Sequence, residues 1–223
     1  MLEPICDNLW HVTQSVRMPG GVVLPLRMTV VKTNSGDLLL HSPVAQPAQW
    51  ADEVAGLGSV RWLVAPNLYH HLYANAALER FPDAQLLAAP GLSQKIPELS
   101  AGTEIGEGLP PELARDLDLV LVGGAPKMNE VALFHKASGS AILGDLVFNV
   151  QTAHNIMTSV LLTAFGTRGR FAKSRMWGML VKDKPAHAES LARICAWPTQ
   201  RVIMGHGEIV EQEARTQLSA ALS

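Results

Sequence analysis

Residues 60–81 contain the feature that most restricts the fold, a buried strand followed by a turn and a helix. Residues 60–64 are a short apolar run that predicts a buried strand, and residues 74–81 have the character of a helix. The turn between them holds two adjacent histidines, His70 and His71. Inside a strand these rings would point to opposite faces, whereas a turn allows both to converge on one ligand. The alternative is one ring packed in the core and the other solvated.

The composition predicts one domain over residues 1–223 and excludes several function classes. Hydrophobic residues make up 48% of the chain and charged residues 17%, which excludes a disordered chain and favours a sheet covered on more than one side. No apolar run is long enough to cross a bilayer, and the first residues lack the features of a secretory signal, so we expect a cytoplasmic protein and no membrane partner. A formal net charge of −2 gives no reason to expect nucleic acid as a partner. Cys6 and Cys195 lack the spacing of a disulfide framework or a zinc knuckle.

The order of predicted elements indicates a layered α/β fold. Strands are expected at 10–13, 28–33, 37–41, 60–64, 85–88, 118–122, 131–135, 140–143 and 201–204, and helices at 47–57, 74–81, 154–165, 170–181, 185–196 and 211–222. The turn signal Asn34-Ser35-Gly36 makes the beginning of the chain an antiparallel hairpin or meander. The later alternation of strands and helices places helices outside packed sheets.

Three predicted strands end in residues that can ligate a metal: the His70-His71 turn, Gly144-Asp145, and Gly205-His206-Gly207. In this order and spacing, the chain resembles the metallo-β-lactamase superfamily. The resemblance covers most of the chain and implies an αββα four-layer sandwich, with residues of about 154–182 as a helical insertion.

The resemblance also implies which metal ligands remain. Family members bind two metals, and the positions of the first metal's ligands are occupied here by Pro66, Leu68 and Pro126, which cannot coordinate. The positions of the second metal's ligands hold His70, His71, Asp145 and His206. His70 stands where the family has Asp. The implied site is therefore mononuclear, with one divalent ion per chain; zinc is favoured, with iron or manganese as alternatives.

The sequence is also similar to a little-described subgroup of this superfamily. The matching stretches are Arg-Met-Thr-Val at Arg27, Leu-His-Ser-Pro at Leu40, Pro-Asn-x-x-His-His at Pro66 and His-Gly-Glu at His206. This subgroup is uncharacterised, so no activity is implied by it.

A metal at such a site would lower the pKa of bound water, and we expect a hydrolase of a small ester, thioester, lactone or amide. Asp145, His41 and Tyr69 are the candidate catalytic residues. His41 and Tyr69 are candidates for stabilising an oxyanion, although His41 could equally be a packing residue at a strand end. A non-catalytic binding scaffold and an iron or manganese redox protein remain as alternatives, and four ligands around zinc would form a closed structural site.

The expected partner is a small-molecule substrate. An anionic substrate is one option because Arg168, Arg170, Lys173 and Arg175 form a basic cluster, although a solvated helix face is the simpler interpretation. A homodimer is a further option, because Met157, Val160, Leu161 and Ala164 keep helical spacing and could form a contact or belong to the core.

Overall fold

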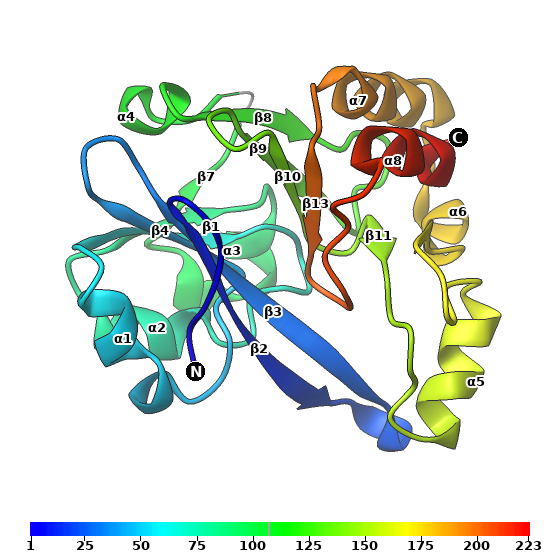
Figure 1. The fold of residues 1–223 in the computed structure, drawn as a ribbon, viewed down its shortest axis with the longest axis horizontal. Helices are drawn as coiled ribbons and strands as arrows, with labels where there is room; N and C mark the ends of the chain where they lie inside the picture. Colours follow the sequence, from blue (N-terminus) through cyan, green and yellow to red (C-terminus); the bar gives the residue numbers. More distant parts are fainter. Residues whose placement is uncertain (107) are drawn as a thin grey trace.

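The computed structural model describes residues 1–106 and 108–223, and these residues form two main β-sheets (Figure 1). The first has the strand order β1-β2-β3-β4-β5-β6-β7 and the second has the order β13-β10-β9-β8. The strands of the first sheet are β1 (Glu3–Cys6), β2 (Leu9–Arg17), β3 (Val23–Lys32), β4 (Leu38–His41), β5 (Val60–Ala65), β6 (Gln85–Ala88) and β7 (Thr103–Glu104). Those of the second are β8 (Leu117–Leu121), β9 (Val131–His135), β10 (Ser140–Leu143) and β13 (Arg201–Met204).

The first sheet changes from antiparallel to parallel pairing at β4. Strands β1 to β4 form the predicted meander, and β4, β5 and β6 then pair in parallel. The β2–β3 hairpin is longer than the sequence patterns predicted, since its register runs from Leu9↔Val31 to Arg17↔Val23. Gly20 and Gly21, both with positive φ, provide the turn at its tip.

Helices cover the outer faces of both sheets, which confirms the αββα sandwich. They are α1 (Ala51–Ala55), α2 (Ala74–Arg80), α3 (Leu92–Lys95), α4 (Pro111–Ala114), α5 (Ile156–Ala164), α6 (Met176–Leu180), α7 (Lys184–Ala196) and α8 (Ala214–Leu222). One core lies between the first sheet and α1 and α2, and another between the second sheet and α6, α7 and α8. The third core joins the two sheets, where Leu39 and Val64 meet Leu133 and Ile203.

The segment 154–182 differs from the prediction of two helices. Helix α5 lies within the first predicted helix, but the second is replaced by the short strand β12 (Ala172–Lys173) and the five-residue α6. Strand β12 pairs with β11 (Val147–Phe148), so its backbone groups form hydrogen bonds with a neighbouring strand and not within a helix. Gly166 and Gly169, both with positive φ, turn the chain after α5.

No helix in the described ranges is long and apolar enough to cross a membrane. The carboxyl end of β5, in the first sheet, lies near the carboxyl ends of β10 and β13, in the second. Strands β10 and β13 pair in parallel, and backbone hydrogen bonds join the loop after β5 to residues 128 and 131, just before and at the start of β9. The residues that follow these three strands form the candidate site.

Candidate metal centre

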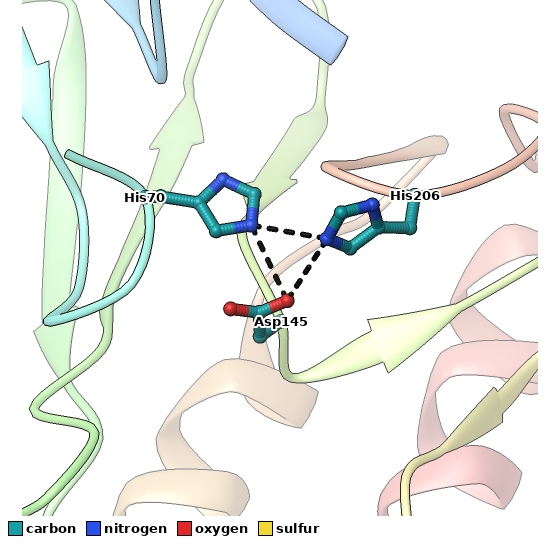
Figure 2. Close-up of side chains that lie close together, drawn as sticks. All are labelled: His70, Asp145 and His206. Carbon is teal, nitrogen blue, oxygen red and sulfur yellow. Dashed lines mark hydrogen bonds and ion pairs between the residues drawn. The ribbon is translucent and has the colours of Figure 1, made fainter. Parts of the chain in front are cut away.

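Three side chains from distant parts of the chain meet at one point. His70 follows β5, Asp145 follows β10 and His206 follows β13, and all three are buried (Figure 2). Asp145 Oδ1 lies 3.2 Å from His70 Nε2 and 3.1 Å from His206 Nε2, and the two Nε2 atoms are 3.2 Å apart. The parallel β10–β13 pair brings Asp145 and His206 to the same sheet edge.

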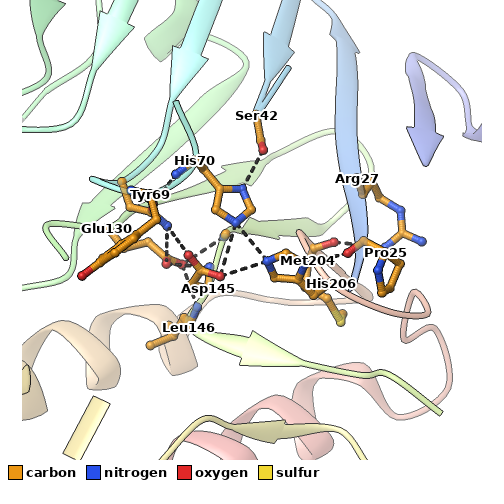
Figure 3. Close-up of polar contacts among 12 residues, drawn as sticks. Pro25, Arg27, Ser42, Tyr69, His70, Glu130, Asp145, Leu146, Met204 and His206 are labelled. Atoms are coloured by element: carbon orange, nitrogen blue, oxygen red, sulfur yellow. Dashed lines mark hydrogen bonds and ion pairs between the residues drawn. The ribbon is translucent and has the colours of Figure 1, made fainter. Parts of the chain in front are cut away.

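His206 is fixed by contacts on both sides of its ring. Its Nδ1–H donates to Pro25 O at 2.6 Å, because a carbonyl oxygen can only accept. The ring stacks on Phe148 with centroids 4.9 Å apart. Arg27 holds the preceding turn, since its guanidinium donates to Met204 O at 3.0 Å and its backbone N–H to Gly205 O at 2.8 Å (Figure 3). Strand β3 therefore positions the imidazole of His206.

His70 is oriented by the loop that carries it and by the end of β4. The buried amide oxygen of Asn67 accepts the backbone N–H groups of Tyr69 and His70, each at 2.8 Å, which fixes the turn. Ser42 Oγ lies 2.6 Å from His70 Nδ1 and can accept a hydrogen bond from an Nδ1–H group (Figure 3). With protons on both Nδ1 atoms, the Nε2 lone pairs of His70 and His206 point to the centre.

A second buried carboxylate, Glu130, supports Asp145. Its two oxygens accept the backbone N–H groups of Gly144, Asp145 and Leu146 at 2.7–3.1 Å. The side-chain amide of Asn67 joins the carboxylates, because it donates to Glu130 Oε2 at 3.2 Å and to Asp145 Oδ2 at 3.0 Å. Glu130 therefore shapes the turn that presents Asp145. Sequence reasoning missed this role, and the only signal was an acidic residue directly before the apolar strand β9.

The two carboxyl groups have opposite pKa shifts. Burial raises the pKa of Glu130 to about 7, and the nearby charge of Asp145 adds to this. Burial would also raise the pKa of Asp145, but His70 and His206, when each also carries a proton on Nε2, hold it well below its usual range through their charges and hydrogen bonds; a cation at the centre would take the place of these two protons. Asp145 is therefore ionised at neutral pH, as a metal ligand must be.

The three central atoms fit a divalent metal. Neighbouring ligand atoms of a tetrahedral site with bonds of about 2.0 Å lie about 3.3 Å apart, close to the three distances found here. With Nδ1–H of His206 committed to Pro25, the neutral ring has only a lone pair at Nε2, and Asp145 offers only lone pairs. No placement of protons on the two rings makes hydrogen bonds of all three contacts among His70, Asp145 and His206. A cation at the centre, in contrast, attracts all three atoms.

His71 lies outside this group of ligand atoms, in contrast to the expectation that both adjacent rings converge. Its carbonyl accepts the N–H of Ala74 at the start of α2, so the chain is already turning into the helix. Partial burial and the positive charge of Lys95 lower the pKa of its ring. The turn directs successive side chains apart, and only His70 faces Asp145.

His41 is buried, with a side chain that is 1% exposed, and does not line the cavity at the site. It shares the face of Leu39, which packs between the two sheets, and its Nε2 has no hydrogen-bond partner among the described residues. Burial lowers its pKa to about 3, with a smaller contribution from the charge of His70. The next residue, Ser42, reaches the site because its φ of 57° turns the chain there. Sequence reasoning named His41 and passed over Ser42.

Tyr69 lies at the mouth of a cavity of about 310 Å³ that ends at the three central side chains. Its side chain is exposed, and Lys95 Nζ lies 4.4 Å from its ring centroid. The remaining lining residues come mainly from the β2–β3 hairpin, α5 and the loop before α2. Tyr69 is thus in a position to contact a molecule in the cavity.

The basic cluster lies elsewhere. Arg168, Arg170, Lys173 and Arg175 are not among the residues that line this cavity. Arg170 Nε donates to Gly166 O at 2.7 Å, and Lys173 Nζ lies 3.3 Å from Leu222 O. These contacts brace the loops after α5, and the option of a basic contact to an anionic substrate gains no support from them.

Comparison with known families and proteins gives one match at the level of sequence. Residues 6–95, less than half of the chain, match a family described as "Domain of unknown function (DUF4336)". No curated protein matches the sequence.

Comparison with solved structures gives matches over the full chain. A metallo-β-lactamase from Erythrobacter litoralis is 18% identical and has a TM-score of 0.68, with 99% of this chain and 95% of that chain covered. The metallo-β-lactamase DIM-1 is 14% identical with a TM-score of 0.67, covering 100% and 95% of the two chains. The metallo-β-lactamase FIM-1 from Pseudomonas aeruginosa, in its mono-zinc form, is 14% identical with a TM-score of 0.63, covering 100% and 94%.

Proposed function

Starting from the premise that this chain has the metallo-β-lactamase fold, we propose that it is a mononuclear metal-dependent hydrolase of a small ester, thioester, lactone or amide. The observation that carries the proposal is the convergence of His70, Asp145 and His206 at the end of a cavity. A divalent ion held by these three side chains would act as a Lewis acid and lower the pKa of bound water.

The number of ligands favours a catalytic site over a structural one. Structural zinc sites are closed by four protein ligands, whereas catalytic sites use three and leave a position open. Three side chains converge here, and the cavity reaches them. The closed site considered for four ligands would need His71, which lies outside the group.

The chain's own residues have distinct roles in this proposal. Ser42 and Pro25 hold the two imidazoles with their Nε2 atoms toward the centre, and Asn67 and Glu130 hold the carboxylate of Asp145. Tyr69 is the candidate donor to the oxygen of a substrate carbonyl as negative charge develops on it. We further propose zinc as the ion and the cytoplasm as the location.

The test compares the wild type with His70→Ala on a panel of esters, thioesters, lactones and amides, after measurement of bound metal. We expect about one metal per chain and hydrolysis above the His70→Ala background for at least one class. Tyr69→Phe should lower kcat by about 10²–10³ without loss of metal, as the removal of one oxyanion donor does in other enzymes. A wild type that binds one metal yet hydrolyses nothing above the background would overturn the proposal.

A second candidate follows from the same donor set. Two histidines and one carboxylate are the ligands that non-haem iron enzymes use. Metal analysis of protein purified without added metal distinguishes the two, because stoichiometric iron with no hydrolysis favours redox chemistry and stoichiometric zinc excludes it.

A further inference from the structure

The cavity at the metal centre separates polar from apolar groups. Its polar residues, Ser42, His70, Asp145 and His206, contact one another and form one end. Tyr69 and Tyr73 are amphipathic. The other lining residues are all apolar: Val16, Met18, Leu24, Leu26, Pro43, Leu72, Phe148, Leu161, Leu162, Phe165 and Met176.

This lining excludes a charged or strongly polar substrate body. Among the described residues, no lysine, arginine or glutamate lines the cavity, and the one acidic residue there, Asp145, is held by two histidines and Asn67. A polar group in the apolar part would lose its water without gaining a hydrogen bond, which is unfavourable. The matching ligand has one polar end and a hydrocarbon remainder.

The size of the cavity limits the length of that remainder. Its volume of about 310 Å³ is at the small end of the range for ligand pockets. If each heavy atom takes roughly the 30 Å³ that a water molecule occupies in the liquid, a chain of roughly six to ten carbons fits. At the mouth, the side chains of Met18 and Leu72 are 45% and 63% exposed, so the apolar surface continues outward.

We infer that the substrate is a carboxylic ester or thioester with a medium-length hydrocarbon acyl chain, and that the chain lies between the β2–β3 hairpin and α5. This inference rests on the proposed function, since it names the substrate of the same site. Hydrolysis breaks the bond between the acyl carbon and the ester oxygen or thioester sulfur, water supplies the new oxygen of the acid, and the alcohol or thiol leaves with a proton.

The first experiment measures binding of saturated fatty acids, the acids that this reaction would release, to the purified protein by isothermal titration calorimetry. Each added methylene should raise affinity by about fourfold from four carbons to about eight, after which the gain should stop as the cavity fills. Affinity independent of chain length would overturn the inference, even if short acetyl esters are hydrolysed and the proposed function stands.

A matched pair of variants on α5 tests the location of the chain. Leu161 lines the cavity, whereas its neighbour Val160 is 61% exposed and does not line it. Leu161→Trp should lower the affinity for octanoate at least tenfold, the equivalent of about two methylenes, and Val160→Trp should leave it unchanged. Equal affinity in the two variants would overturn the location, provided that thermal unfolding shows both folded; Leu161→Glu, with Val160→Glu as its control, repeats the test with a charge.

The hydrolysis of p-nitrophenyl butyrate, hexanoate and octanoate separates the two proposals. An increase of kcat/KM with chain length supports both. Chain-length-dependent binding without hydrolysis leaves the acyl site intact as a binding site and overturns the hydrolase, whereas hydrolysis with no preference for length overturns only the acyl inference.

Discussion

The loop after β5 has two sides that differ in what they contact. Residues 66–68 pack against β9 and the segment before it: Val131 N–H, at the start of β9, donates to Pro66 O at 2.7 Å, and Leu68 N–H donates to Met128 O at 3.0 Å. The Leu68 side chain is buried in the first core. Residues 69 and 70 instead face the cavity, and His70 meets Asp145 there. We call these the packed side and the open side of the loop.

The difference agrees with the mononuclear site that the resemblance implies. The resemblance aligns Pro66, Leu68 and Pro126 with the ligands of the first metal. On the packed side, Pro66 and Leu68 now join two segments of the chain by backbone hydrogen bonds and apolar contact. On the open side, each central side chain has its own hydrogen-bond partner. Residues 66 and 68 are thus held by packing and backbone hydrogen bonds, and the three central side chains by hydrogen bonds that orient them toward one point.

The largest expected effect is a difference in bound metal between variants of the two adjacent histidines of this loop. His70→Ala should reduce bound metal from about one per chain to near zero, because even the loss of a ligand's outer hydrogen-bond partner costs about 10–100-fold in metal affinity. His71→Ala is the matched control and should retain the metal, since its ring lies outside the group. Elemental analysis after gel filtration measures both. Equal loss in the two variants would mean that the loop rearranges to bring His71 onto the metal.

A smaller effect is expected when a histidine is returned to the packed side. Leu68→His should bind no second metal, and its free energy of unfolding should fall by roughly 2–3 kcal/mol, because a polar ring replaces a buried apolar side chain. Leu72→His, at an exposed position of the same loop, should change stability by less than about 0.5 kcal/mol. Urea unfolding of both variants decides this. If Leu68→His bound two metals per chain, the packed side would be able to hold a metal, which would contradict its assignment as a packing region.

The smallest effect concerns His41, which is buried at the end of β4, next to the strand β5 from which the loop starts. Its pKa is about 3 in the folded protein and about 6.5 in the unfolded chain, so below pH 6.5 the unfolded chain binds more protons and stability falls as pH falls. At pH 5.5 the loss from this residue is about 1.3 kcal/mol relative to pH 7. His41→Gln should remove that part of the pH dependence, and the exposed His154→Gln should not. Identical slopes for wild type and His41→Gln would show that His41 is solvated in the native state.

The sequence predicted elements better than it predicted the directions of side chains. Strand-end motifs and the resemblance were sufficient to select Asp145, His206 and the loop of His70. They predicted that His70 and His71 would both be ligands, whereas only His70 faces the centre, because the Asn67 side chain fixes the turn that separates the two rings. His41 was selected because it ends a predicted strand that leads to the site, and Ser42 was not considered. The positive φ at Ser42 turns the chain so that Ser42, and not His41, reaches the site. The sequence assigned the β12 segment to a helix. The segment is extended because it pairs with β11, and a pairing between separate parts of the chain is not visible in the local sequence pattern.

The distance in sequence between His70 and His206, 136 residues, has a consequence for biosynthesis. A growing chain that has reached only β11 contains two of the three central side chains, His70 and Asp145, and lacks the parallel strand that brings the third to them. A fragment limited to residues 6–95 contains only one of them. Capture of a metal by all three must therefore wait until β13 and His206 have left the ribosome and β13 has paired, so a bound ion would report that the second sheet is complete.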